Sequence, residues 1–452
     1  MKNLSKLLLA IVIIATFFIR FNGFTTPHNF TFDEAVYSTL GKQLQENIFD
    51  YNTIKLYESQ TSHGRNLPAH YNRHLFVHPP VFSLLIALSY TFFGVHLYSA
   101  AFVSIFFGLM LIVLAFLFGK VLFDEKVGVY AALFMAIEPI SWITSQKIWM
   151  ETTLAFFMGF SLYCFYRGIK RYHPVWIIAG GFIAGIATLT KYPGVLLVGV
   201  LFLYAILVER WLFSKKAFIF SLCLPFIMLI PWVCWNFIIL GSDFLSTLHY
   251  TKMVGALIVR YFWLAIVLPL GYFGIKEACQ KSEKICLITR IISIVFLFFV
   301  VRGALLHCFD PNYLPRSGWE MGMFRNEPKS FYLGRLLELS PVYLFSFLGL
   351  IPLLFSKRYF KERLFLFLYS GIVLMFFTLW RGFQSRYILS AVVPLVVIAV
   401  QTLFYLSDKI SCLPGKYVIP VRVLFCGMII FCLFKTLILN FSLAMSNNIC
   451  YF

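Results

Sequence analysis

The sequence predicts an all-α integral membrane protein. Hydrophobic residues make up 60% of the 452 residues and charged residues only 13%, whereas a typical soluble domain is about 25% charged. The apolar residues form runs that are long enough to cross about 30 Å of hydrocarbon as helices. These runs lack the alternation of apolar and polar residues that is typical of a membrane β-barrel strand. A bundle of spanning helices is therefore expected.

Positively charged residues set the expected topology. The net charge of +19 comes from lysines and arginines in short clusters between the apolar runs, whereas a nucleic-acid-binding protein would gather them on one face or tail. Such clusters are typical of cytoplasmic loops, where anionic lipids also attract them. We therefore expect membrane lipids and no nucleic acid as partners, and place in the cytoplasm the clusters containing Lys2, Lys120, Arg167, Arg210, Lys276, Lys357 and Lys409.

About thirteen spans satisfy this topology, because two crossings must separate each cytoplasmic cluster from the next. The apolar stretch 81–93 is short for a crossing and follows two prolines. It is expected to be an amphipathic helix at the outer membrane surface, within a first outer loop of residues 24–97. The spans are expected at residues 5–23, 98–119, 128–145, 152–169, 174–190, 192–209, 217–240, 256–275, 286–303, 341–356, 364–380, 386–406 and 420–441.

The chain is expected to form two transmembrane modules without a soluble domain. Residues 1–210, with the outer loop 24–97, form the catalytic module, and residues 211–452, with the outer loop 304–340, form the second. The first apolar run follows two lysines as in a signal peptide, but no small-residue cleavage site comes after it, so it is expected to remain as an anchor. The sequence thus predicts a multi-pass protein of the inner or plasma membrane.

An acidic pair opens a helical stretch in the first outer loop. Thr31 precedes Phe32, Asp33 and Glu34, so Thr31 and Glu34 have the spacing of a capping box, and capping alone is enough to explain them. Capping does not explain Asp33. A carboxylate in the first helical turn is kept ionised by the helix dipole and by free backbone N–H groups. Asp33 is therefore suited to accept a proton from a hydroxyl group.

Several short motifs follow one another along the chain. They are Asp33-Glu34, His78-Pro79-Pro80, Glu138-Pro139 ahead of Glu151, Leu189-Thr190-Lys191-Tyr192-Pro193 and Arg386-Tyr387. On these motifs the sequence resembles the GT-C glycosyltransferases, and within them the group that contains the protein O-mannosyltransferases and the lipid A aminoarabinose transferase. The resemblance covers residues 1 to about 210, and beyond them mainly the helix count and the Arg386-Tyr387 motif.

The resemblance implies an inverting transfer of a sugar from a polyprenyl-phosphate donor to a hydroxyl group of a lipid, glycan or protein on the non-cytoplasmic side. It makes Asp33 the general base and Glu34 its helper. Tyr37, one helical turn beyond Asp33, matches a tyrosine near the donor, although packing in the core explains it equally well.

The leaving lipid phosphate needs cations near its oxygens, and the resemblance points to Lys191, His78 and Arg386. Lys191 has an alternative role as an anchor that only reaches the membrane interface. His78 stands where related sequences often have lysine, and histidine is only partly protonated at neutral pH. Glu151 and Tyr387 are expected to contact substrate, although a carboxylate such as Glu151 also suits a helix start.

Histidines are frequent in the first outer loop, and three of them recur every four residues. On one helix face that spacing could hold a metal ion, but Pro79 limits any helix there. No cofactor is predicted, and the sequence leaves a divalent metal undecided. The loop histidines are His28, His63, His70, His74 and His78.

Two other functions stay open at this point. A transporter or lipid flippase would be expected to have paired broken helices and charged residues at mid-membrane depth, whereas the charges here lie at the ends of apolar runs and in loops. A membrane polymerase or ligase of surface polysaccharides would also handle lipid-linked sugars.

Overall fold

The computed structural model describes residues 2–25, 30–63, 71–75, 77–241, 331–380 and 384–445. The regular structure within these ranges is helical, apart from one isolated β-bridge between Asn52 and His74. The spans expected at 256–275 and 286–303 lie outside the described residues, as does most of the loop 304–340.

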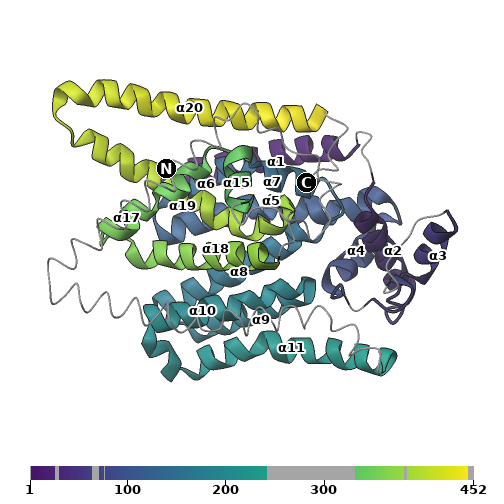
Figure 1. The fold of residues 1–452 in the computed structure, drawn as a ribbon. Coiled ribbons are helices and arrows are strands. Elements are labelled where there is room, and N and C mark those ends of the chain that lie inside the picture. Colours follow the sequence, from purple (N-terminus) through teal and green to yellow (C-terminus); the bar gives the residue numbers. More distant parts are fainter. Residues whose placement is uncertain are drawn as a thin grey trace.

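The helices follow one another closely along the chain (Figure 1). In chain order they are α1 (Lys2–Thr25), α2 (Phe32–Glu46), α3 (Ile54–Ser62), α4 (Val81–Phe93), α5 (Leu97–Leu122), α6 (Glu125–Ala136), α7 (Pro139–Ser145), α8 (Glu151–Lys170), α9 (Pro174–Thr190), the 3-10 helix η2 (Tyr192–Val195), α10 (Leu196–Leu207), the 3-10 helix η3 (Arg210–Ser214), α11 (Lys216–Leu240), α15 (Phe331–Leu339), α16 (Tyr343–Leu348), α17 (Leu350–Phe355), α18 (Phe360–Trp380), the 3-10 helix η5 (Ser385–Ile388), α19 (Leu389–Ser411) and α20 (Gly415–Met445).

The lengths and apolar composition of these helices are those of a multi-pass integral membrane protein. Five helices in the described ranges are long and apolar enough to cross a membrane, and the bent pair α6 and α7 would make a sixth span. Shorter apolar helices, such as α4, α9 and α10, accompany them. The all-α prediction is confirmed, whereas thirteen spans of full length are not confirmed within the described ranges.

The span expected at 128–145 is broken in the structure. Helix α6 ends at Ala136, and α7 leaves it at an angle of 55°. Pro139, the first residue of α7, has no backbone N–H to continue the hydrogen bonds of α6. The Glu138 side chain caps α7 instead by accepting from the Ser141 backbone N–H at 2.6 Å. The prediction of one continuous helix over 128–145 was therefore wrong, because a capped break divides this apolar run into α6 and α7.

Side chains from distant helices satisfy the polar groups of this break. The Tyr343 hydroxyl donates to Glu138 Oε1 at 2.6 Å, and Asn440 Nδ2 of α20 donates to the Ile137 carbonyl at 2.6 Å. The fully buried Arg20 of α1 donates to Ser145 Oγ at 3.1 Å. Since a bare backbone group costs several kcal/mol in lipid, these contacts fix the segment that leads into residues 146–151.

The segment expected to form the first outer loop contains a compact group of helices at one end of the bundle. Helices α2, α3 and α4 lie together there, at the right in Figure 1. Helix α4 has the bounds expected from the sequence, and it packs closely on α2, since a Cβ atom at Gly41 would lie 2.4 Å from Ile86 Cγ2. The other face of α4 exposes Leu88 and Phe92. An exposed apolar face of this kind suits contact with lipid.

Candidate active site

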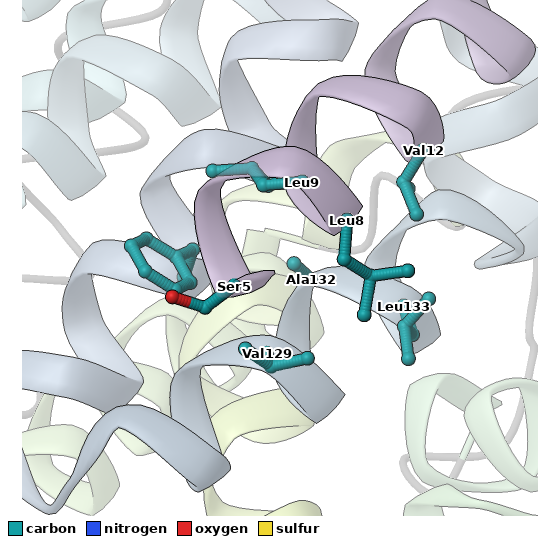
Figure 2. A pocket seen from close by; sticks show the side chains of 8 residues that line it. Ser5, Leu8, Leu9, Val12, Val129, Ala132 and Leu133 are labelled. Atoms are coloured by element: carbon teal, nitrogen blue, oxygen red, sulfur yellow. The ribbon is translucent and has the colours of Figure 1, made fainter. Parts of the chain in front are cut away.

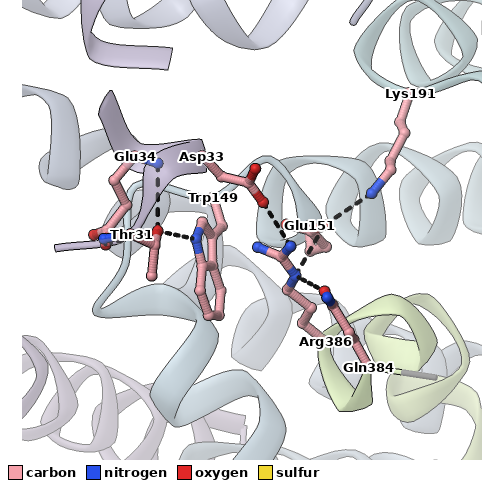
Figure 3. A network of polar contacts seen from close by, with 8 residues as sticks. All are labelled: Thr31, Asp33, Glu34, Trp149, Glu151, Lys191, Gln384 and Arg386. Atoms are coloured by element: carbon pink, nitrogen blue, oxygen red, sulfur yellow. Dashed lines mark hydrogen bonds and ion pairs between the residues drawn. The ribbon is translucent and has the colours of Figure 1, made fainter. Parts of the chain in front are cut away.

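Two carboxylates and two cations from four parts of the chain meet beside the start of α2 (Figure 3). Arg386 Nη2 donates to Asp33 Oδ2 at 2.6 Å, and Lys191 Nζ donates to Glu151 Oε1 at 2.8 Å. Arg386 Nε lies 3.8 Å from the same Glu151 oxygen and links the two pairs. The sequence named all four residues, and the structure brings them together.

Breaks between helices place the two cations. Lys191 stands between α9 and η2, and Arg386 lies in η5, just before α19. Close packing holds the first break, because a Cβ atom at Gly194 would lie 2.4 Å from the Ala187 carbonyl carbon. Pro193 lies in the 3-10 turn that follows Lys191. The two cations thus project from short irregular segments into one site.

Aromatic rings and one amide orient the cations further. Lys191 Nζ lies 4.3 Å from the centre of the Tyr387 ring, and the Arg386 guanidinium lies 4.2 Å from that of Trp149. Such cation–π contacts are favourable, and more so away from water. Gln384 Oε1 accepts from Arg386 Nε at 2.7 Å. Lys191 therefore points into the site, toward Glu151 and Tyr387.

Asp33 is the most accessible of the four charged side chains. It is 29% exposed, against 15% for Lys191, 8% for Arg386 and 4% for Glu151. Burial raises the pKa of the Asp33 carboxyl, but the positive charges of Arg386, His78 and Lys191 together outweigh burial, so the pKa lies below its ordinary value. Asp33 is thus an ionised carboxylate that a substrate could reach from outside.

Glu34 has a different place from Asp33. It forms the expected capping box, since its Oε2 accepts from the Thr31 backbone N–H at 2.8 Å. The same oxygen lies 3.6 Å from Lys147 Nζ, and Oε1 accepts from the Ile148 N–H at 3.2 Å. Glu34 is fully buried. These contacts tie the start of α2 to the segment before α8, as a positioning residue would.

The sequence analysis missed Lys147 and Trp149. Trp149 Nε1 donates to Thr31 Oγ1 at 3.2 Å, while its ring supports Arg386, so this residue connects α2 to the second module. Lys147 did carry a signal. It lies between the spans expected at 128–145 and 152–169, in a segment that the expected topology puts outside, where lysine departs from the positive-inside pattern.

Tyr37 and His78 lie next to each other at the edge of the site. Their ring centres are 5.3 Å apart with the planes at 78°, and Tyr37 also packs edge-to-face on Phe82. His78 is close enough to Asp33 to contribute to the lowering of its pKa. The Tyr51 hydroxyl donates a hydrogen bond to the His78 carbonyl oxygen at 2.9 Å. His78 therefore lies near the Asp33 carboxylate.

The described histidines do not form the helical face considered for a metal. His74 lies in the β-bridge with Asn52, and His78 lies in a bend, while His28 and His70 lie outside the described residues. Burial lowers the pKa of His74 to about 4. Within the described part of the chain, no group of three or more His, Cys, Asp or Glu side chains could hold a metal ion.

A small pocket lies away from this site, between α1, α5 and α6 (Figure 2). Ser5 lines it, and the Ser5 hydroxyl donates to Glu125 of α6. The other lining residues are apolar, and none carries a positive charge that would bind a phosphate. The candidate site is therefore the charged group of Figure 3.

The sequence and the fold are both similar to those of known glycosyltransferases. A family profile described as "Dolichyl-phosphate-mannose-protein mannosyltransferase" matches residues 77–235. The solved structure of ArnT from Cupriavidus metallidurans bound to undecaprenyl phosphate is 15% identical, with a TM-score of 0.51 over 98% of this chain and 74% of ArnT. The fold is that of the GT-C glycosyltransferases.

A second structure shares the GT-C fold. The archaeal oligosaccharyltransferase AglB from Archaeoglobus fulgidus, in complex with an inhibitory peptide and a dolichol-phosphate, is 14% identical with a TM-score of 0.58. That match covers 98% of this chain and 56% of AglB. None of the curated proteins searched matches the sequence. The expected resemblance to GT-C glycosyltransferases, and to mannosyltransferases and ArnT among them, is thus confirmed.

The GT-C fold of this chain draws its candidate site from both expected modules. The range matched by the family profile contains His78, Glu151 and Lys191. Asp33 lies before that range, and Arg386 and Tyr387 lie after it. The ion pair between Asp33 and Arg386 therefore joins the start of α2 to η5.

Proposed function

We propose that this protein is an inverting glycosyltransferase that moves a sugar from a polyprenyl-phosphate donor to a hydroxyl acceptor on the outer face of the membrane. The observation that carries the proposal is the accessible Asp33 carboxylate beside two inward-pointing cations, Lys191 and Arg386. The ligands of ArnT and AglB are lipid phosphates, which agrees with a donor of this class.

The reaction follows from these charges. The acceptor hydroxyl gives its proton to Asp33 while its oxygen forms a bond to the anomeric carbon of the sugar. The bond from that carbon to the phosphate oxygen breaks, and its electron pair stays on the phosphate. Lys191 and Arg386 stabilise the charge that develops there. A single displacement of this kind inverts the configuration at the anomeric carbon.

Neighbouring residues supply contacts for the sugar. Glu151 Oε2 is buried and has no hydrogen-bond partner within the described residues, so it can accept from a sugar hydroxyl group. Tyr37 and Tyr387 are buried beside the charged group, where Tyr37 packs on His78 and the Tyr387 ring lies under Lys191, so both rings help to shape the substrate site. Glu34 holds the helix that carries Asp33, and in this role it helps the base without taking a proton itself.

Comparing cells with and without this chain tests the proposed function. Mass spectrometry of envelope lipids and glycans should show that one sugar-bearing species is lost when the chain is absent. The purified protein, given polyprenyl-phosphate sugar and the envelope fraction from those cells, should restore that species and release polyprenyl phosphate. An unchanged envelope together with an intact donor would contradict the proposal.

The sidedness of the site has its own test. Ser62 at the end of α3 and Ser214 in η3 are both exposed, so cysteines placed there in a cysteine-free background are equally open to a reagent. A reagent that does not cross the membrane should label Ser62→Cys in intact cells, and should label Ser214→Cys only after permeabilisation. Labelling of Ser214→Cys in intact cells would reverse the assigned topology.

A further inference from the structure

The cations of the site are paired with its own carboxylates. Arg386 is paired with Asp33 at 2.6 Å, and Lys191 is paired with Glu151 at 2.8 Å. Two positive and two negative side chains thus balance each other in a largely buried place. An incoming phosphate has to compete with a carboxylate for the same N–H groups, because both are acceptors of charge-assisted hydrogen bonds.

We propose that the lipid phosphate displaces Asp33 from Arg386 when it binds, so that the general base is released only after the donor is in place. This inference rests on the proposed function, since it takes the donor to be a lipid phosphate and Asp33 to be the base. It adds an order to the reaction, with the donor bound before the acceptor hydroxyl is activated.

Asp33 is the partner that can leave. Its side chain is 29% exposed and can turn toward water, whereas Glu151 is 4% exposed and remains between Lys191 and Arg386. Arg386 would keep its place, because its guanidinium lies on the Trp149 ring and its Nε is held by Gln384. The exchange therefore requires a side-chain movement of Asp33 and no movement of the cation.

The start of α2 stays fixed during this exchange. The capping box of Thr31 and Glu34 and the nearby Lys147 hold the helix from its buried side. Asp33 lies in the first turn, where backbone N–H groups favour its charge after the guanidinium is lost. The exchange removes the Arg386 contact, which lowers the basicity of Asp33 more than His78 or Lys191 does.

Release changes the chemistry of Asp33. While it is paired, the Arg386 guanidinium keeps the pKa of the Asp33 carboxyl below its ordinary value, and His78 and Lys191 act in the same direction. The Glu151 carboxylate, close to Arg386, raises the pKa of nearby acids, because its negative charge disfavours a second negative charge. A bound phosphate adds negative charge and takes up the Arg386 N–H groups, so the carboxylate becomes a stronger base.

Binding of undecaprenyl phosphate, without sugar, to the purified full-length protein tests this exchange. Asp33→Asn should bind the lipid phosphate about tenfold more tightly than the parent, because a neutral amide competes for the Arg386 N–H more weakly than the carboxylate does. Glu46→Gln is the matched control. It removes one negative charge from the same helix, at a side chain that is 65% exposed and 4.0 Å from Lys42, and should leave the affinity unchanged.

A double-variant cycle assigns the effect to the ion pair. In an Arg386→Met background, Asp33→Asn should no longer tighten binding, because the competition has been removed already. Melting curves show that each variant is folded, and Asp33→Ser replaces Asp33→Asn if the latter does not fold.

The outcomes separate this inference from the proposed function. Equal or weaker binding by folded Asp33→Asn overturns the exchange, and so does equal tightening by Glu46→Gln, which would show a general charge effect. Both results leave the transferase proposal standing. A parent protein that does not bind undecaprenyl phosphate at all counts against the proposed donor itself, and with it the exchange.

Discussion

Replacing Asp33 by asparagine should reduce sugar transfer by about 10²- to 10⁴-fold, the range typical of a lost general base. Asparagine keeps the size of the side chain and can still accept the Arg386 N–H that lies 2.6 Å from Asp33 Oδ2. Asparagine also tolerates the start of a helix. It cannot take the acceptor proton. The measurement is the initial rate of transfer by the purified variant at saturating donor.

Two comparisons make this result specific to Asp33. The Glu46→Gln variant, altered at the exposed end of α2, should transfer at the parental rate. If Asp33→Asn binds donor more tightly as inferred above, its KM for donor should fall together with kcat. A folded Asp33→Asn protein with parental turnover would remove Asp33 from the mechanism.

Removing the charge of Lys191 should have the second largest effect. Lys191→Met should reduce donor-dependent transfer by about 10²- to 10³-fold, as does the loss of one group that stabilises developing charge. Lys191→Arg should recover only part of this, because the planar guanidinium fills space differently from the ammonium group between Glu151 and Tyr387. Transfer is measured with purified variants, alongside their melting curves.

The matched control for Lys191 is Lys170, which lies at the end of α8 opposite Glu151. Lys170 is exposed and donates only to the Val121 carbonyl in the described structure, so Lys170→Met should leave transfer unchanged. A Lys191→Met protein that melts and turns over like the parent would show an anchoring role. The cation for the leaving phosphate would then be sought at Arg386 and His78.

The sequence predicted helices well where local residues mark their ends. Helix α9 has the expected bounds, with Pro174 at its first position, and α4 begins after Pro80 and ends before Gly94, whose φ is +80°. Such signals act locally, because proline favours a first helical turn and glycine accepts a positive φ. The break before Pro139 was not predicted, since it depends on Tyr343 and other side chains far along the chain.

In the candidate site, too, features marked by local sequence were predicted, whereas contacts between distant residues were not. The resemblance supplied Asp33, Glu151, Lys191 and Arg386, and the capping box of Glu34 followed from local spacing. The pairing of Asp33 with Arg386 joins residues 353 positions apart. No local pattern encodes such a contact, because it depends on how the start of α2 and η5 both meet Trp149 and Glu151.

The transporter alternative can be compared with the helix geometry. That alternative expects broken helices in corresponding halves, and the described residues contain one strongly bent pair, α6 and α7. The break holds Glu138 and is closed by hydrogen bonds from Tyr343 and Asn440. These hydrogen bonds fix the segment that leads to Glu151, so this broken helix has a structural role that the transporter alternative does not require.

The hydrogen bond from Asn440 to the Ile137 carbonyl also bears on how the chain is made. The two residues are 303 positions apart, so α6 and α7 are synthesised and inserted long before α20 exists. Until then the Ile137 carbonyl has no Asn440 to satisfy it, and lipid supplies no substitute. We expect the newly made bundle to remain incomplete at this break during translation and to mature only when its last described helix docks. Chains released before residue 440 would then be recognised and degraded as unfinished, although they already contain every residue of the candidate site.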